Sequence, residues 1–333
     1  MPGETGSLTA NPYLRVREKN VVDCSARPLE ALKPGELRLK AEFTMVSPGT
    51  ELHHITGTHT KPTTYPRATG YIAVSRVIGL EGDGGEFKIG QRVLGGWGHS
   101  AYSNVTPDRV QAIPDKVDSV DACSVVLLGI SLRGVRAGQI RLGDSVAVYG
   151  LGLIGAFAAH LAKVAGGYPV IGIDPVPMRR EIAAKLGVDA ALDPTAADFK
   201  ARLKELTRGS GPFISIDATG TARVMPTLVE TTAEFGRVVV LGGVHGQVPL
   251  DLYTNFQKGN LTMVGCGSAY PADYPFTVER NQEALLDMIA AGQVRPRPAI
   301  THVAPWRQGP ELYRMLLEEK DKALGVAFDW REK

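Results

Sequence analysis

The feature that most constrains the fold is a regular alternation of strand-like and helix-like segments between residues 145 and 268. Short apolar runs such as "SVAVYG", "YPVIGID" and "RVVVLGG" are separated by segments of helical length, such as "LIGAFAAHLAKVAG". Strands joined by helix-length connections run parallel, and their crossovers place helices on both faces of the sheet. This part of the chain is therefore predicted to form an α/β domain with a doubly wound parallel sheet.

The turn after the first of these strands reads "GLGLIG" and has the GxGxxG spacing of a dinucleotide-binding turn. Gly150 permits the tight turn, Gly152 lets the backbone approach a pyrophosphate, and Gly155 lets the helix pack against the strand. Leu153 and Ile154 begin the helix, whose first N–H groups would face the phosphates. A structural glycine turn in an unrelated α/β protein is the alternative, but the flanking strand and helix favour a nucleotide site.

The next predicted strand ends at Asp174, where the ribose of a bound dinucleotide would lie. A carboxylate there can accept hydrogen bonds from the ribose hydroxyls and would repel a 2′-phosphate, which favours NAD(H). Arg179 and Arg180 follow closely and could attract a 2′-phosphate, so NADP(H) stays open as the alternative. A second alternative for Asp174 is a capping role at the strand end.

Two later strands end in the glycine-containing turns "DATG" and "LGGV". In this class of sheet, ligands gather in the crevice at the carboxyl ends of the strands. Thr219, Gly243 and Val244 are therefore predicted to lie beside the nicotinamide half of the cofactor.

The first 120 residues have a different texture, with short strand-like runs such as "ELRLKAEF" and "GYIAVSRVIGL" between Gly, Pro and Asp turns. A chain of 333 residues exceeds one ordinary core, so two domains are expected. We place a β-rich domain at residues 1–122 and 271–333, and the nucleotide-binding domain at residues 123–270.

Composition and charge exclude several classes of function. A net charge of +2 provides no broad field for nucleic acid or an anionic membrane. The sequence contains no apolar run long enough for a transmembrane helix and no signal-peptide pattern at its N-terminus. The three cysteines are far apart and form no CxxC pair, so a reducing cytoplasm is the expected location.

The order of these pieces resembles the medium-chain dehydrogenase/reductase superfamily, and the likeness covers nearly the whole chain. It is carried by "PGTELHHITG", "FKIGQRVLGGWGHSAYSNV" and "RLGDSVAVYGLGLIGAFAAHLAKVAG". The resemblance implies a GroES-like β-rich catalytic domain with an inserted Rossmann domain. A narrower likeness, to the zinc-free subgroup that includes bacteriochlorophyllide dehydrogenases, is carried by "SPGTE", "ITH" and "DW".

Zinc members of the superfamily have a segment similar to Cys-Gly-Ser-Asp-Leu-His, which aligns with residues Pro48 to His53. The resemblance therefore places proline at the ligand cysteine, Tyr71 at the ligand histidine, and Leu127 and Leu128 at the third ligand position. A catalytic zinc site needs three protein ligands of N, O or S type, so no metal is predicted. The alternative is a differently built site from the histidines His53, His54, His59 and His99.

Without a metal, side chains must handle the proton. The resemblance places Thr50 where a hydroxyl contacts the substrate oxygen, and His53 follows three residues later. A threonine hydroxyl is too weakly acidic to act alone but can pass a proton to an imidazole, which titrates near neutral pH. We therefore predict a relay from Thr50 to His53, with local backbone bonding and a surface histidine as the alternative. Tyr71 is a further candidate proton donor, or else a packed side chain that fills the space of the metal.

Three residues near this segment, Ser47, Trp97 and His99, are predicted to shape the substrate pocket. A core tryptophan and a solvated histidine are the alternatives for the last two.

These features predict a zinc-independent, NAD(H)-linked oxidoreductase that interconverts a secondary alcohol and a ketone on a polyol, a sugar-like molecule or a biosynthetic intermediate. A reductase of activated carbon–carbon double bonds is the second possibility, and a non-catalytic cofactor-binding protein is the third. By family likeness, the run "LTMVGCGS" is expected to form a sheet edge that joins two copies into a homodimer.

Overall fold

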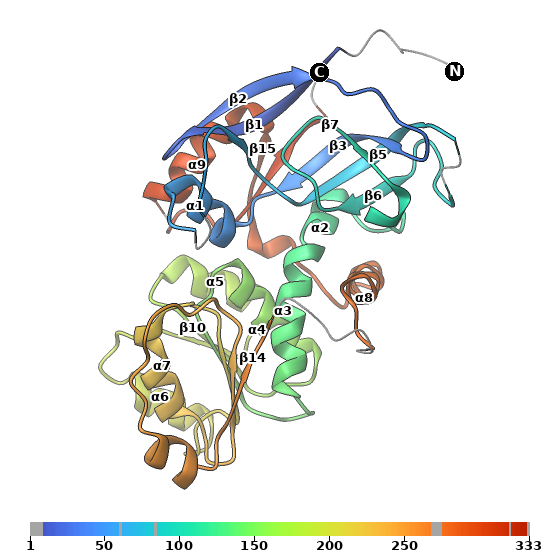
Figure 1. Cartoon of the computed structure of the whole chain (residues 1–333). Coiled ribbons are helices and arrows are strands. Elements are labelled where there is room, and N and C mark those ends of the chain that lie inside the picture. The colour runs from blue at the N-terminus through green and yellow to red at the C-terminus, as the bar shows by residue number, and fades with distance from the viewer. Residues whose placement is uncertain (1–8, 60–61, 83–84, 268–274, 320, 332–333) are drawn as a thin grey trace. The chain divides into compact units, whose positions relative to one another are not determined.

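The structure is a computed structural model that describes residues 9–59, 62–82, 85–267, 275–319 and 321–331 (Figure 1). The chain divides into two compact units. Unit 1 comprises Met1–Ser124 and Ile300–Lys333, and unit 2 comprises Val125–Ala299. Each unit is described by itself below.

Unit 2 is built on a six-stranded sheet in the order β11-β10-β9-β12-β13-β14. All five strand pairs are parallel, so the carboxyl ends of the strands meet at one edge of the sheet. The strands are β9 (Val146–Tyr149), β10 (Val170–Ile173), β11 (Ala190–Leu192), β12 (Ile214–Asp217), β13 (Arg237–Val240) and β14 (Thr262–Gly265).

The central strand β9 shows why helices cover both faces of this sheet. Its side chains alternate, so Val146 and Val148 belong to one apolar cluster while Ala147 and Tyr149 belong to another. All four side chains are buried, as expected for a parallel strand with two covered faces.

The helices of unit 2 follow the predicted alternation and are labelled in part in Figure 1. They are α3 (Val125–Gly138), α4 (Leu153–Val164), α5 (Pro177–Lys185), α6 (Phe199–Leu206), α7 (Met225–Thr231) and α8 (Val278–Ala290). Short 3-10 turns lie at Ala222–Val224 and Arg297–Ala299, and an unpredicted π-helical turn lies at Tyr253–Lys258.

The boundaries of the units differ from the predicted domains mainly at the second junction. The predicted boundary after residue 270 lies outside the described residues, and the compact units divide after Ala299 instead. The physical reason is the packing of α8 against α3. The guanidinium of Arg136 on α3 lies 3.7 Å from the ring centroid of Phe276, and Arg295 donates its backbone N–H to His160 on α4.

Unit 1 is β-rich and contains two sheets. A three-stranded antiparallel sheet has the order β2-β1-β4, and a seven-stranded sheet has the path β15-β16-β3-β5-β6-β8, with β7 paired to β3. The strands are β1 (Ala10–Glu18), β2 (Val21–Pro28), β3 (Leu37–Met45), β4 (Arg67–Ala68), β5 (Ala73–Leu80), β6 (Arg92–Gly95), β7 (Tyr102–Val105), β8 (Val110–Ala112), β15 (Ile300–Pro305) and β16 (Gly325–Asp329).

The C-terminal segment completes unit 1. Strand β16 pairs with β3, so a segment near the end of the chain enters the sheet that β3 and β5–β8 form. The helices of the unit are α1 (Pro48–Thr56), α2 (Ser119–Cys123) and α9 (Gly309–Glu318), with 3-10 turns at Pro107–Arg109 and Trp306–Gln308. One apolar cluster joins residues of β1, α1, α9 and β16, which explains why a segment distant in sequence belongs to this unit.

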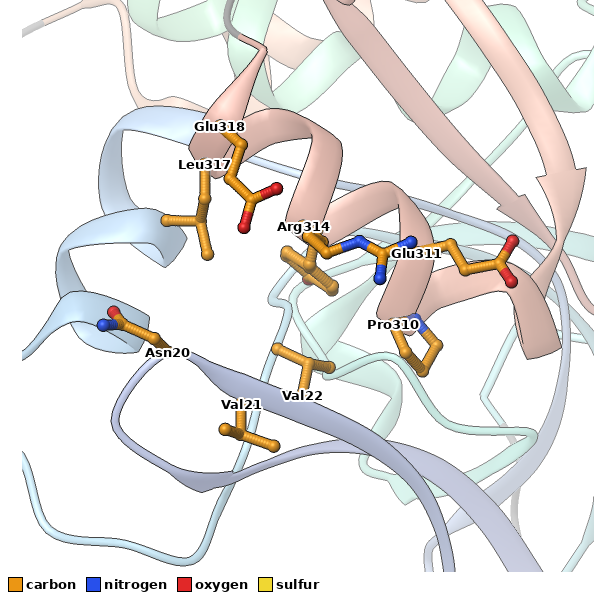
Figure 2. A pocket seen from close by; sticks show the side chains of 9 residues that line it. Asn20, Val21, Val22, Pro310, Glu311, Arg314, Leu317 and Glu318 are labelled. Carbon is orange, nitrogen blue, oxygen red and sulfur yellow. The ribbon is translucent and has the colours of Figure 1, made fainter.

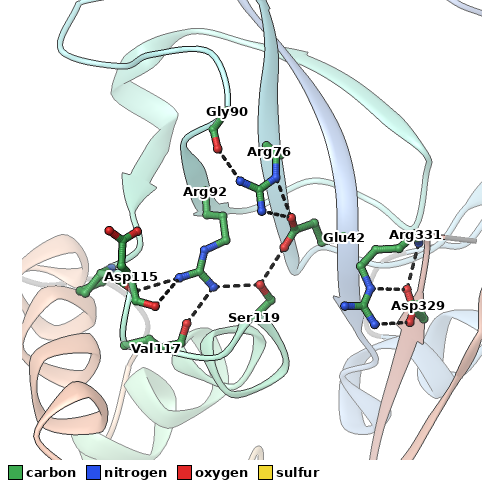
Figure 3. A network of polar contacts seen from close by, with 10 residues as sticks. Glu42, Arg76, Gly90, Arg92, Asp115, Val117, Ser119, Asp329 and Arg331 are labelled. Atoms are coloured by element: carbon green, nitrogen blue, oxygen red, sulfur yellow. Dashed lines mark hydrogen bonds and ion pairs between the residues drawn. The ribbon is translucent and has the colours of Figure 1, made fainter. Parts of the chain in front are cut away.

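A polar network fastens α2 to the large sheet (Figure 3). Glu42 on β3 accepts hydrogen bonds from Arg76 at 2.5 Å and from the hydroxyl of Ser119 at 2.7 Å. Arg92 donates to the same hydroxyl at 3.1 Å and to the carbonyl of Val117 at 2.8 Å. These bonds fix the end of the β-rich region where the chain passes into α2.

The predicted fold class is confirmed: unit 1 is a GroES-like β-rich domain and unit 2 is a Rossmann domain with a doubly wound parallel sheet. Among the helices in the described ranges, none has the length and apolar character needed to cross a membrane.

Candidate functional site

The GLGLIG turn joins β9 to α4 and has the geometry that its glycines predict. Gly150 adopts a φ of +87°, in the left-handed region that favours glycine. Its N–H donates to the carbonyl of Ile173 at 2.7 Å. A Cβ on Gly155 would lie 1.7 Å from the carbonyl oxygen of Gly150, so α4 packs directly against the turn. No larger residue fits at Gly155 without displacing backbone.

The position of Gly152 is open, in contrast to that of Gly155. A Cβ there would meet no heavy atom within 4 Å. Gly152 is also the N-cap of α4, and no side chain caps that helix start. The uncapped N–H groups and the helix dipole therefore favour an anion at this point. The residues of the turn fit the diphosphate of a dinucleotide.

Asp174 follows β10 and is buried, with 3% of its surface exposed. One carboxylate oxygen accepts the N–H of Leu151 at 2.8 Å, and the other accepts the N–H of Val176 at 2.9 Å. The guanidinium of Arg179 lies 3.4 Å from the carboxylate. Asp174 thus supports the glycine turn, as the capping alternative proposed. The oxygen that accepts from Val176 keeps a second lone pair for a ribose hydroxyl, whereas the other oxygen also accepts from Arg179.

The other predicted cofactor residues lie at the same edge of the sheet. Thr219 follows β12, and its hydroxyl donates to Asp217 at 2.6 Å. A Cβ on Gly150 would lie 2.8 Å from the methyl group of Thr219, so these two turns are in contact. Gly243 follows β13 and lies against Gly220, and Val244 comes directly after it. The structure therefore brings the glycine turn and both later turns together.

In unit 1, two of the three predicted catalytic residues, Thr50 and His53, lie on the short helix α1. Ser47 is its N-cap, Pro48 fixes the first helical position, and Gly57 ends the helix with a φ of 67°. Thr50 and His53 are both exposed. Their spacing of three residues places them on one face of the helix.

The predicted relay between Thr50 and His53 is not closed by a direct bond. His53 Nδ1 lies 2.8 Å from the hydroxyl of Thr58, which lies 2.8 Å from the hydroxyl of Thr56. The side chain of Thr50 makes no hydrogen bond to another described residue. A proton passing between Thr50 and His53 would need a bridging hydroxyl, such as that of a ribose or a water molecule.

Tyr71 and Ser47 form a pair of hydroxyl groups. The phenol of Tyr71 donates to Oγ of Ser47 at 2.6 Å. Ser47 is buried and Tyr71 is half-buried. The two residues that were predicted separately, as a proton donor and a pocket residue, are thus in direct contact at the start of α1.

Trp97 and His99 are both buried, with 8% and 1% of their surfaces exposed. Trp97 belongs to an apolar cluster of unit 1, and its indole N–H donates to Ser75 at 3.3 Å. Its edge reaches a small cavity of about 190 Å³ beside β2 and β7. The ring of His99 packs edge-on against Phe328 at 5.0 Å. These contacts agree with the core alternative for Trp97 and assign His99 to an interior network.

That network centres on Glu51, which the sequence reasoning did not single out. One carboxylate oxygen accepts the N–H of Ser47 at 2.7 Å. The other accepts the hydroxyl of Thr69 at 2.8 Å and the phenol of Tyr313, and lies 3.2 Å from Nε2 of His99. Burial by itself raises the pKa of the Glu51 carboxyl, but the histidine and the hydrogen bonds outweigh burial and hold the pKa below its usual value.

The histidines outside this network do not converge. His54 and His59 stack with ring centroids 3.9 Å apart, and Arg67 lies 2.8 Å from Nδ1 of His54. Burial, together with the charges of Arg67 and His59, lowers the pKa of His54. Leu127 and Leu128 are buried apolar side chains of α3. In the part of the chain that the structure describes, no three His, Cys, Asp or Glu side chains are grouped to hold a metal ion.

A separate cavity of about 520 Å³ lies between the turn at Asn20 and helix α9 (Figure 2). Val22, Pro310 and Leu317 contribute apolar surface, and Arg314 lies along its wall. None of the predicted site residues lines this cavity as far as the described residues show, but Tyr313, which donates to Glu51, is one of its lining residues.

Comparison with known proteins supports the same fold and function class. A family model described as "Zinc-binding dehydrogenase" matches residues 154–283. D-guloside 3-dehydrogenase of Escherichia coli (strain K12) is 29% identical over 205 residues, which cover 60% of this chain and 59% of that protein. The alignment thus covers less than two thirds of that relative. The 2-dehydro-3-deoxy-L-galactonate 5-dehydrogenase of Pseudoalteromonas atlantica is 25% identical over 90% of this chain and 92% of its own.

Among solved structures, alcohol dehydrogenase TADH from Thermus sp. ATN1 superposes with a TM-score of 0.83 at 22% identity. The superposition covers 96% of this chain and 99% of that structure, and it therefore supports the fold of both units. The glycine turn, the paired β-rich and Rossmann units and these likenesses agree. These findings support membership of the medium-chain dehydrogenase/reductase superfamily.

Proposed function

We propose that this protein is a nicotinamide-dependent oxidoreductase that interconverts a secondary alcohol and a ketone without zinc. The observation that carries the proposal is the GLGLIG turn. At Gly155 helix α4 packs directly against the turn, whereas at Gly152 the backbone has free space in which a diphosphate could bind. Membership of the superfamily supports the reaction class. The named dehydrogenases among its relatives support an alcohol as the reduced substrate.

The residues of unit 2 would bind and orient the cofactor. The uncapped start of α4 holds the diphosphate, and Asp174 accepts a ribose hydroxyl while it stays bonded to the turn. Thr219, Gly243 and Val244 border the nicotinamide. When bound, the nicotinamide exchanges a hydride with the substrate carbon. We favour NAD(H), because the Asp174 carboxylate lies at the ribose position, and we treat NADP(H) as the alternative because Arg179 lies beside it.

The residues of α1 and its neighbours would handle the proton. Thr50 is exposed and makes no side-chain bond to another described residue, so its hydroxyl is available to a substrate oxygen. His53 is exposed on the same helical face and can exchange the proton with solvent. The phenol of Tyr71, which donates to Ser47 at 2.6 Å, is the alternative donor. Positioning beside the cofactor would contribute most of the acceleration.

The proposal of zinc independence rests on residue chemistry. The three positions that the family resemblance assigns to ligands hold Pro48, Tyr71 and the leucine pair on α3. Proline and leucine offer no donor atom, and one tyrosine cannot complete a three-ligand site. Metal analysis of the purified protein should find less than one zinc per ten chains, and a chelator should leave activity unchanged. A stoichiometric zinc would contradict this part of the proposal.

The substrate is proposed to be a polyol or sugar-like molecule. The two relatives described above are named as dehydrogenases of a guloside and of a deoxy-galactonate derivative. A panel of polyols, sugar acids, simple ketones and enones, assayed with NADH and NADPH, would identify the class. Reduction of enones but not ketones would indicate a double-bond reductase instead.

Variants of α1 test the catalytic roles. Thr50→Ala and His53→Ala should each lower kcat by about a hundredfold, because general acid–base groups contribute on that order. The affinity for NADH should stay within about twofold if the cofactor is held mainly by unit 2. His302→Ala, which changes a histidine on β15, is the matched control and should retain activity.

Two outcomes would redirect the proposal. If Thr50→Ala and His53→Ala keep full activity while Tyr71→Phe loses it, the phenol is the proton donor. If the wild-type protein binds NADH but turns over no member of the panel, a non-catalytic role as a cofactor-binding protein becomes the better interpretation.

We also propose a homodimer formed through β14. This strand is at the edge of the six-stranded sheet, and Met263 on it is 38% exposed. An exposed edge strand offers unpaired N–H and C=O groups to a second copy. Sedimentation should give twice the chain mass, and Met263→Pro, which removes an N–H that faces away from β13, should shift it to the monomer. The three cysteines form no disulfide with one another, which is consistent with a reducing compartment.

A further inference from the structure

We propose that Glu51 is a positioning residue, which uses its buried carboxylate to hold the start of α1 in the geometry needed for proton transfer. The inference rests on the proposed function, since it concerns the residues that would move the proton. It assigns a role to the C-terminal segment, which supplies Tyr313 to the carboxylate.

The first step of the argument is the cost of burying this carboxylate. Glu51 is 3% exposed, and an isolated ionised group in such a place is strongly unfavourable. Among the described residues, no lysine or arginine reaches it. Its compensation comes from the N–H of Ser47, two hydroxyls and an imidazole. The buried carboxylate is stable only when all of these donors are in place, because the loss of any donor leaves part of its desolvation energy without compensation.

The second step is the origin of the donors. Thr69 adjoins β4, Tyr313 is on α9, and His99 follows β6. His99 continues the chain of bonds, since its Nδ1 lies 2.7 Å from the hydroxyl of Thr44. That hydroxyl accepts the indole N–H of Trp330 at 2.9 Å. The carboxylate therefore joins α1 directly to three other segments of unit 1, and through His99 to two more, at Thr44 and Trp330.

The third step connects the carboxylate to the candidate catalytic groups. Glu51 directly follows Thr50 and accepts the backbone N–H of Ser47. Ser47 in turn accepts the phenol of Tyr71 at 2.6 Å. The helix start carries no side-chain cap from Ser47 itself. The Glu51 carboxylate instead binds the N–H of the N-cap residue itself, and the orientation of both candidate proton donors depends on this bond.

A merely structural role is the alternative, and the chain offers a matched comparison. Thr69→Val removes one hydroxyl donor from Glu51. Thr232→Val removes a hydroxyl of similar burial in unit 2, where Thr232 donates to Ser215 at 2.7 Å. The two changes are chemically identical, and each should destabilise its own unit. Only the change at Thr69 touches the carboxylate. Tyr313→Phe is a second variant with the same target.

The experiment uses the full-length protein at a temperature where every variant is folded. It measures kcat, KM and the primary isotope effect with 4-deuterated NADH on the best ketone of the panel. It also measures the affinity for NADH and amide hydrogen exchange of the peptide covering residues 46–57. The expected result for Thr69→Val and Tyr313→Phe is a fall in kcat of about tenfold or more, because displacements below 1 Å affect reacting groups strongly. NADH affinity should be unchanged, and amide exchange should be faster in α1.

Thr232→Val should leave kcat and the exchange of residues 46–57 unchanged. The inference is overturned if Thr69→Val and Thr232→Val affect kcat equally, or if α1 exchanges at the wild-type rate in both Thr69→Val and Tyr313→Phe. A wild-type protein that binds NADH but reduces no ketone would defeat the proposed function instead. The exchange measurement would then still decide whether the carboxylate anchors the helix.

Discussion

The two candidate sites of this chain differ in the groups that form them: one consists mainly of backbone and the other of side chains. In unit 2 the cofactor site consists mainly of backbone: a left-handed glycine, an uncapped helix start and turns at the carboxyl ends of parallel strands. In unit 1 the candidate catalytic segment depends on side chains that come from four separate stretches of sequence. Glu51, Thr69, His99 and Tyr313 meet only because two sheets and two helices bring them together.

This difference determines how each site should respond to change. A site formed by backbone groups tolerates a substitution where the new side chain has room. It loses its geometry where the backbone must move to accommodate the side chain. A network of buried side chains fails when a single donor is lost, because the remaining polar groups are left without compensation. The predictions below test this contrast, beginning with the largest effect.

The largest effect is expected at Gly155. Gly155→Ala would place a methyl group 1.7 Å from the carbonyl oxygen of Gly150. The helix or the turn must shift, at a cost of about 3 kcal/mol or more. NADH affinity should fall by more than about a hundredfold, as the diphosphate contacts depend on this geometry. Fluorescence titration with NADH and thermal unfolding measure both effects.

Gly152→Ala is the control for that prediction. Its methyl group meets no atom within 4 Å, so the unfolding temperature should be unchanged. The same methyl group occupies space that the diphosphate needs, so NADH affinity should fall by about tenfold. If Gly155→Ala binds NADH as well as Gly152→Ala does, the close packing of α4 on the turn is not required for binding.

An intermediate effect is expected when the pH is lowered, because the two units should lose stability at different pH values. Burial lowers the pKa of His160 on α4. Its Nδ1 lies 2.7 Å from the carbonyl of Leu186, and its Nε2 accepts the N–H of Arg295 at 3.0 Å, which requires the neutral ring. A depressed folded pKa contributes stability above the unfolded value, about 6.5 for histidine, and this is lost as pH falls through the folded pKa. As the pH falls, unit 2 should therefore lose stability before unit 1 does. Its free energy of unfolding should fall by about 1.4 kcal/mol per unit of pKa shift.

The carboxyl of Glu51 also has a lowered pKa, although its burial acts in the opposite direction. Its contribution is present above the unfolded glutamate value, about 4.3, and is lost only as pH falls through the folded pKa. Hydrogen exchange of each unit between pH 7.5 and 4 should show this order. His160→Asn keeps a hydrogen-bond donor and an acceptor but does not titrate. In this variant, unit 2 should therefore no longer lose stability between pH 7 and 5. An unchanged pH dependence in that variant would contradict the assignment.

The smallest effect is expected at Arg179. Its guanidinium lies 3.4 Å from Asp174 and is 24% exposed. A contact of this partly exposed guanidinium with a 2′-phosphate would contribute about 0.2 to 1 kcal/mol, which corresponds to less than about fivefold in affinity. Arg179→Gln should weaken NADPH binding by about that factor and leave NADH binding unchanged. Equal weakening of both cofactors would show that Arg179 acts through the shape of the turn.

Most of unit 2 could be predicted from the sequence because its signals are local. Strand β9, the glycine turn and helix α4 are consecutive in the chain, and their alternation of apolar residues sets both faces of the sheet. The edge at which Asp174, Thr219 and Gly243 gather follows from parallel pairing alone. The compact units divide after Ala299 rather than near residue 270, because α8 packs against α3 through contacts such as that of Arg136 with Phe276, which the sequence does not indicate.

The interior of unit 1 could not be predicted in the same way. Glu51 reads as an ordinary charged residue of a short helix, and His99 reads as a candidate pocket residue in a glycine-rich loop. Nothing near either residue in the sequence indicates that they face each other. A chemical signal was available in principle, since Glu51 lies four residues before the apolar Ile55, on the same face of a helix that must bury one face.

By itself, the sequence determined the superfamily, the parallel sheet and the backbone cradle for a dinucleotide, because these depend on residues that are close together in the chain. Only the tertiary structure decided which polar groups are bonded to each other. Asp174 is bonded to the glycine turn, Tyr71 to Ser47, and the buried carboxylate of Glu51 to the start of its own helix α1. The physical reason is that hydrogen bonds between distant segments form only after their strands and helices have packed. Hydrophobic periodicity specifies that packing, but it does not specify which polar side chains will then lie within bonding distance.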